Sequence, residues 1–135
     1  MTGNVRVVAL FFAACSVLCG CDSGRRAEPT KFPVSGSVTI DGKPLAQGVV
    51  YFKTIATGAL DSAEVKDGKF QGKAQQGERR VEVCSYEKLP ANANDPMSSD
   101  LQKNTIPARY NTESKLTANV TPNGPNEFEF KLTSK

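Results

Sequence analysis

The sequence contains no histidine and no tryptophan. Histidine is the side chain that most often transfers protons near neutral pH, and it recurs in nucleophilic catalytic sites and in most zinc sites. Carboxylates offer no replacement, because Glu127 and Glu129 alternate with phenylalanines in "EFEFKL" and are expected on a solvated outer face. We therefore expect a non-catalytic protein with no cofactor and no metal site.

A strong charge of either sign is also missing. The chain has 17 lysines and arginines against 14 aspartates and glutamates, a net charge of +3. The basic residues are scattered, and their densest clusters, "GRRAEP" and "GERRVE", contain no aromatic residue on which a base could stack. We interpret these clusters as solvated surface and expect no nucleic-acid partner.

Cysteine is scarce, and three of the four cysteines lie within the first 21 residues. That region begins with Arg6, continues with the apolar run Val7 to Cys19 and ends at the small residue Gly20, which is the layout of a secretory signal peptide. The apolar run is shorter than the roughly 18 residues of a transmembrane helix. No permanent membrane span is expected.

The four residues Leu18-Cys19-Gly20-Cys21 resemble a bacterial lipobox, in which the final cysteine is lipidated and becomes the first residue of the mature chain. The resemblance implies that Cys21 carries a diacylglycerol. One acyl chain anchors a protein only marginally, at about 0.8 kcal/mol per buried methylene, whereas two or more chains anchor it firmly. The expected location is therefore the cell envelope, at the periplasmic face of the inner membrane or at the outer membrane and cell surface. The alternative is an ordinary cleaved signal peptide that leaves Cys21 free.

This interpretation also accounts for the other cysteines. Cys15 and Cys19 leave with the signal peptide, and the lipid blocks Cys21, so Cys84 remains alone. An intramolecular disulfide is then impossible, and the C-x-C spacing cannot serve a metal.

Three segments follow from the composition: a signal peptide at residues 1–20, the lipidated cysteine with a flexible tether at 21–33, and one small domain at 34–135. The domain alternates apolar and polar residues with a period of two, and helical periodicity is absent. The Asp41-Gly42 and Asp67-Gly68 pairs predict tight turns rather than calcium sites, because dense oxygen ligands are missing. Strands are predicted in these segments: "VSGSVTI", "GVVYFKT", "SAEVK", "KFQG", "RRVEVCSY", "KLTANVT" and "EFEFKL".

Two regions are candidates for a partner surface. Tyr51 and Cys84 point away from the core in the predicted strands; Cys84 is either a small hydrophobe covered by a loop or the tether, or the site of an intermolecular disulfide. The irregular stretch Lys88 to Pro107 is long for a compact domain and is either a recognition loop or a disordered insertion. Within it we single out its polar residues Asn94, Asp95 and Asp100.

The order of the segments "VSGSVTIDGKPLAQGVVYF", "VKDGKF", "GERRVEV" and "IPARYNTESKLTANVTPNGPNEFEFKL" resembles the carboxypeptidase regulatory-like, or transthyretin-like, domains of small bacterial cell-envelope lipoproteins. The resemblance covers nearly the whole mature chain. It implies an all-β protein, a seven-stranded Greek-key β-sandwich of the prealbumin or immunoglobulin-like type, generally without catalytic activity. The chain departs from the family pattern at Arg79, where an aromatic residue is common.

Two functions are compatible with these features. The first is a lipid-anchored, non-catalytic module of the cell envelope that acts in adhesion or scaffolding or binds an envelope protein. The second is an accessory domain that binds a surface polysaccharide, which the lack of tryptophan disfavours. An enzyme is the remote third alternative, because the transthyretin relatives that hydrolyse a uric-acid breakdown product depend on histidines and on a C-terminal Tyr-Arg-Gly-Ser motif, whereas this chain ends in "KLTSK".

Overall fold

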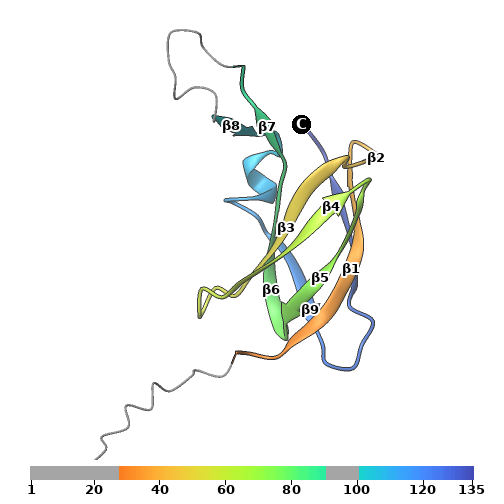
Figure 1. The fold of residues 1–135 in the computed structure, drawn as a ribbon, viewed down its shortest axis with the longest axis vertical. Helices are drawn as coiled ribbons and strands as arrows, with labels where there is room; N and C mark the ends of the chain where they lie inside the picture. The colour runs from red at the N-terminus through yellow and green to blue at the C-terminus, as the bar shows by residue number, and fades with distance from the viewer. Residues whose placement is uncertain (1–27, 91–100) are drawn as a thin grey trace, which may run out of the picture.

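The computed structural model describes residues 28–90 and 101–135, and in them the chain is all-β, as the sequence predicts. Figure 1 shows an elongated body with a two-stranded ribbon projecting from one end. The elements are β1 (Lys31–Ile40), β2 (Lys43–Pro44), β3 (Gln47–Lys53), β4 (Leu60–Lys66), β5 (Lys69–Gln75), β6 (Gly77–Cys84), β7 (Tyr86–Lys88), β8 (Gln102–Asn104), the short 3-10 helix η2 (Ala108–Tyr110), β9 (Leu116–Val120) and β10 (Glu127–Leu132).

The main strands form one continuous curled sheet in the order β10-β1-β5-β4-β3-β6-β9, and β2 pairs with the end of β1. All pairings are antiparallel except β1 with β10, which is parallel. Strands β4 and β5 pair only beside their turn, at Val65–Phe70 and Lys66–Lys69. The sheet therefore bends at this hairpin and encloses the core between its two halves.

The predicted turns and core faces are confirmed. Asp41-Gly42 and Asp67-Gly68 both have positive φ angles, as tight hairpin turns require. Four phenylalanines, Phe52, Phe70, Phe128 and Phe130, join the two halves of the sheet, with neighbouring ring centroids 5.9–6.3 Å apart. Gly36 makes room for them, because a Cβ atom there would lie 1.8 Å from the Phe128 carbonyl oxygen and 2.8 Å from Phe70 Cζ.

Two boundaries differ from the sequence interpretation. Strand β1 begins at Lys31, so residues 31–33 of the expected tether pair with β5. The stretch from Lys88 to Pro107, expected to be irregular throughout, contains the end of β7 and all of β8. Its exit packs on the body as expected, because Ile106 is buried and Tyr110 contacts the core.

The interpretation of "GERRVE" as solvated surface is wrong for Arg79. This side chain is 1% exposed and is paired with Asp61, which is also 1% exposed, at 2.7 Å between Nη2 and Oδ2. The same Nη2 donates to the Phe52 carbonyl oxygen at 2.9 Å, and Asp61 Oδ2 accepts from the Gln75 backbone N–H at 2.9 Å. Lys31 Nζ adds an ionic contact, 3.0 Å from Asp61 Oδ1. One buried ion pair therefore connects β1, β3, β4, β5 and β6.

Breaking this ion pair should destabilise the domain. Asp61→Leu or Arg79→Met alone leaves one buried charge without its partner, which costs about 3–5 kcal/mol of unfolding free energy. The double variant Asp61→Leu/Arg79→Met removes both charges and should recover most of that loss. Urea unfolding of the four proteins tests this, with Glu64→Gln as the control because Glu64 and Lys66 form an exposed pair. Fully additive losses in the double variant would contradict the assigned coupling.

Candidate functional site

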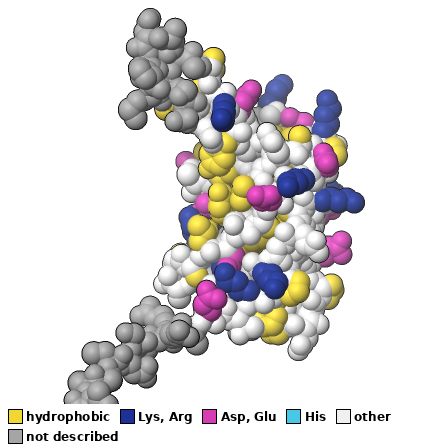
Figure 2. Space-filling model, in the orientation of Figure 1, with side chains coloured by type: hydrophobic (Ala, Val, Ile, Leu, Met, Phe, Trp, Pro, Cys, Tyr) yellow, Lys and Arg dark blue, Asp and Glu magenta, His cyan; other side chains and the backbone are white. Residues whose placement is uncertain are grey.

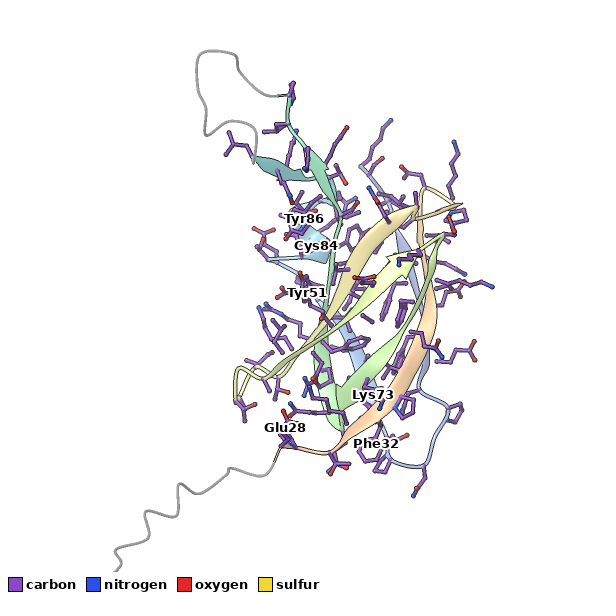
Figure 3. All side chains as sticks on the ribbon, viewed as in Figure 1. Glu28, Phe32, Tyr51, Lys73, Cys84 and Tyr86 are labelled. Atoms are coloured by element: carbon purple, nitrogen blue, oxygen red, sulfur yellow. The ribbon has the colours of Figure 1, made fainter. Side chains whose placement is uncertain are left out.

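The outer face of β3 and β6 carries the candidate site. The strand register places Val49 opposite Cys84, Tyr51 opposite Glu82, and Lys53 opposite Arg80. Figure 3 shows Tyr51, Cys84 and Tyr86 in one column on this face, and Figure 2 shows hydrophobic side chains gathered there between charged ones. We call these seven residues the Tyr51 face: Val49, Tyr51, Lys53, Arg80, Glu82, Cys84 and Tyr86.

Cys84 is a free thiol that is only 6% exposed although it lies on the outer side of the sheet. Tyr86, the first residue of β7, interacts with it. A hydrogen bond with the Cys84 side chain, followed by smaller effects of charge and burial, raises the pKa of the Tyr86 phenol. Tyr86 itself is 46% exposed. The small-hydrophobe interpretation of Cys84 agrees with this burial, whereas an intermolecular disulfide would require Cys84 to become exposed.

Charged residues form the next part of the face. Lys53 Nζ donates to Glu82 Oε1 at 3.1 Å, and Arg80 pairs with the same carboxylate oxygen. Burial opposes ionisation of Glu82, but the hydrogen bonds from Arg80 and Lys53 outweigh it, so the pKa of Glu82 lies below its ordinary value of 4.5. Two cations therefore share one carboxylate, and this part of the face keeps a net charge of +1.

Strands β7 and β8 form a ribbon that extends the face beyond the end of β6, and we call residues 86–89 and 101–104 the arm. Its base is held by hydrogen bonds. Asn104 Oδ1 accepts from the backbone N–H groups of Ser85 and Ile106, at 3.2 and 3.0 Å. Ser85 Oγ donates to the Gln47 carbonyl oxygen at 2.8 Å. The arm carries exposed Leu89 and Leu101, which adjoin across it through the Leu89 N–H and the Leu101 carbonyl, 2.9 Å apart.

Open clefts adjoin the face at both ends. Tyr86 lines two of them, of about 600 and 550 Å³, beside the arm and beside β3 and β4. A third, of about 450 Å³, lies under the β3–β4 connection and is lined mainly by apolar surface that includes Ile55 and Ala56. A wider hollow of about 1020 Å³, with a mixed polar and apolar lining, crosses the other half of the sheet and includes Ser35, Ser37, Gln71, Glu127 and Glu129.

The structure brings together some of the predicted site residues and leaves others untested. Tyr51 and Cys84 lie on one face, as the alternation predicts. Cys21, Asn94, Asp95 and Asp100 lie outside the described residues. In the described ranges, 28–90 and 101–135, no group of three histidine, cysteine, aspartate or glutamate side chains is placed to hold a metal ion. None of the described helices has the length and hydropathy needed to cross a bilayer.

Sequence reasoning missed several residues that shape the site. The alternation does place Tyr86 and Glu82 on the side of Cys84, but it does not predict the contact between Tyr86 and Cys84. Ser85 and Asn104 position the arm, but they are 19 residues apart and no local pattern links them. Asp61 and Arg79 did carry a signal, because each is in phase with the buried apolar residues of its own strand.

Comparison of the chain with protein-family models, with curated proteins and with solved structures finds no match.

The lowered pKa of Glu82 predicts a pH-dependent contribution to stability. A carboxylate with a depressed folded-state pKa stabilises the fold above its ordinary value of 4.5, and the contribution is lost as pH falls through the folded-state value. Glu82→Gln should therefore be less stable than wild type at pH 7, by about 1 kcal/mol or less, and equal to it near pH 2–3. Urea midpoints measured from pH 7 to 2.5 test this. A constant difference across that range would contradict the assignment.

Proposed function

We propose that this chain is a non-catalytic, lipid-anchored module of the bacterial cell envelope that binds a partner protein through the Tyr51 face and the arm. The observation that carries the proposal is an exposed hydrophobic and aromatic surface at the end of the body opposite the N-terminal segment. In Figure 1 the described chain begins at the lower end, next to the start of β6, and the arm projects beyond the other end of β6. A chain anchored at Cys21 would present the arm away from the membrane.

The composition of the surface supports a protein partner. Tyrosine is enriched at the centres of protein interfaces, and large apolar side chains that remain exposed together often mark such sites. Tyr86, Leu89 and Leu101 are exposed on the same arm. The hydrogen bonds at its base order the ribbon in advance, which reduces the conformational entropy that binding would have to remove.

The proposed family is a carboxypeptidase regulatory-like β-sandwich. Three features support it: a path of seven main strands, a curled sheet that encloses one core, and Asp-Gly turns at the two places where the resemblance expects them. In domains of this architecture the strands form the packed core, and ligands are commonly bound by loops and projecting segments.

A polysaccharide is the second candidate partner, and the wide hollow on β10, β1, β5 and β4 favours it. Hydroxyl, amide and carboxylate groups line that hollow, and these groups can hydrogen-bond sugar hydroxyls. A glycan array distinguishes the two candidates. Binding that is lost in Gln71→Ala but kept in Tyr86→Ala would favour the polysaccharide.

The anchor is tested by Cys21→Ala. The variant should move from the detergent phase to the aqueous phase in Triton X-114 partitioning. It should not be labelled by a palmitate analogue, because only a cysteine thiol accepts the diacylglycerol. Cys19→Ala is the matched control and should label as the wild type does. If Cys21→Ala is still labelled by the palmitate analogue and still partitions into detergent, the assignment is wrong.

The binding surface is tested by site-specific photo-cross-linking in intact cells. A photoreactive amino acid at Tyr86 or Leu101 should yield one defined adduct band. The same probe at Lys69 or Lys73, which are exposed residues of β5 on the other half of the sheet, should not. Equal cross-linking at all four positions would show that the arm has no special role in binding.

A further inference from the structure

The two ends of the strand path are open edges. In residues 28–90 and 101–135, β9 pairs only with β6 and β10 pairs only with β1. An unpaired edge offers backbone N–H and C=O groups to another strand. The side chains that flank those groups decide which strand can add, and in which register.

The free groups of β10 can be identified from its pairing with β1. The Ser35 N–H donates to the Asn126 carbonyl oxygen and the Asp41 N–H donates to that of Leu132, so the even-numbered residues face β1. Glu127, Glu129 and Lys131 therefore direct their backbone groups to the open edge. Thr133 has the same parity, but its N–H donates to Tyr110 Oη and its carbonyl accepts from Arg109. The open ladder thus ends at Lys131.

We propose that β10 pairs with β10 of a second copy of this chain, antiparallel, about a two-fold axis at Phe130. In this register Glu129 lies opposite Lys131 of the second copy, and Lys131 lies opposite Glu129. Both residues direct their backbone groups outward, so each of these two pairs exchanges two backbone hydrogen bonds. The side chains of Glu129 and Lys131 are 59% and 72% exposed, share the outer face and pair with each other within one chain, with Lys131 Nζ 3.2 Å from Glu129 Oε2. In the dimer each of these charges also faces its opposite across the ladder, so two intermolecular contacts are added to the two intrachain pairs.

The same register suits the neighbouring residues. On the core side it places Phe128 opposite Leu132, an apolar pair. Glu127 falls opposite Thr133, whose backbone groups are bound by Tyr110 and Arg109, so the ladder is confined to residues 129–131. Moving the axis to Glu129 would put Glu129 opposite itself, which is a like-charge pair at the centre. The outer residues of β9, Thr117 and Asn119, are uncharged and select no register.

This inference does not depend on the proposed anchor or on the proposed partner protein. A ladder of four backbone hydrogen bonds and two exposed ion pairs predicts a weak, reversible dimer, because exposed pairs contribute only about 0.2–1 kcal/mol each. The isologous contact closes on itself, and none of the paired residues belongs to the arm.

Charge reversal tests the proposal in the processed full-length protein, by sedimentation equilibrium in detergent, or without detergent if the protein proves to be unlipidated. Glu129→Lys alone and Lys131→Glu alone each create two like-charge contacts and should weaken dimerisation about tenfold or more. The double variant Glu129→Lys/Lys131→Glu restores opposite charges and should dimerise as the wild type does. Unfolding midpoints of all variants separate association from monomer stability.

Glu64→Lys and Lys66→Glu are matched controls, because they alter an exposed pair on β4 with the same spacing along the strand. Neither should change dimerisation. The register is tested separately by cysteine pairs: Glu129→Cys/Lys131→Cys should form an intermolecular 129–131 disulfide, identified by mass spectrometry. A wild type that stays monomeric at millimolar concentration would overturn the proposal. So would single reversals without effect, a double reversal that fails to restore the dimer, or a double-cysteine variant that forms only 129–129 or 131–131 disulfides.

Discussion

The buried ion pair between Asp61 and Arg79 is the constraint on which the rest of the fold depends. Two charges removed from water are tolerated only where hydrogen bonds and an opposite charge compensate for the lost hydration. Here the compensating groups come from the β3 carbonyl of Phe52, the Gln75 N–H at the end of β5 and Lys31 at the start of β1. The strands can satisfy these charges together only in one relative arrangement. The pair therefore specifies how this end of the curled sheet closes.

Hydrogen bonding of the Asp61–Arg79 pair is incomplete, because Arg79 Nε has no hydrogen-bond partner among the described residues. A buried donor without a partner costs free energy, so the pair is better understood as a device for specificity than as a net source of stability. At the other end of the body, neutral groups have the corresponding role. Asn104 and Ser85 connect the base of the arm to β3 and to the chain leading into η2. The body thus has one end closed by charge and one end closed by neutral hydrogen bonds.

The surfaces proposed to bind a partner protein and a second copy lie on different strands. The Tyr51 face and the arm belong to β3, β6, β7 and β8, whereas the open edge belongs to β10 in the other half of the sheet. A second copy on β10 and a partner protein on the arm would then occupy different parts of the molecule. The charges on β10 can also protect an exposed edge from unspecific pairing, because only an oppositely ordered strand matches them.

The sequence by itself determined the all-β class, the two Asp-Gly turns and the face of nearly every strand. These properties are local, because the alternation of side chains follows from the pleat and the turns follow from the backbone freedom of glycine. The alternation also placed Tyr51 and Cys84 on a common outer side.

Only the tertiary structure decided which strands pair, that β1 and β10 run parallel, and that Arg79 lies inside. Pairing depends on contacts between distant residues, such as Ser85 with Asn104 and Asp61 with Arg79, which no local pattern encodes. The sequence does not show whether an arginine in phase with valines is buried, because the free-energy cost of burying its guanidinium depends on whether a carboxylate lies within reach. That condition is met only when β4 and β6, each hydrogen-bonded to β3, bring Asp61 and Arg79 together.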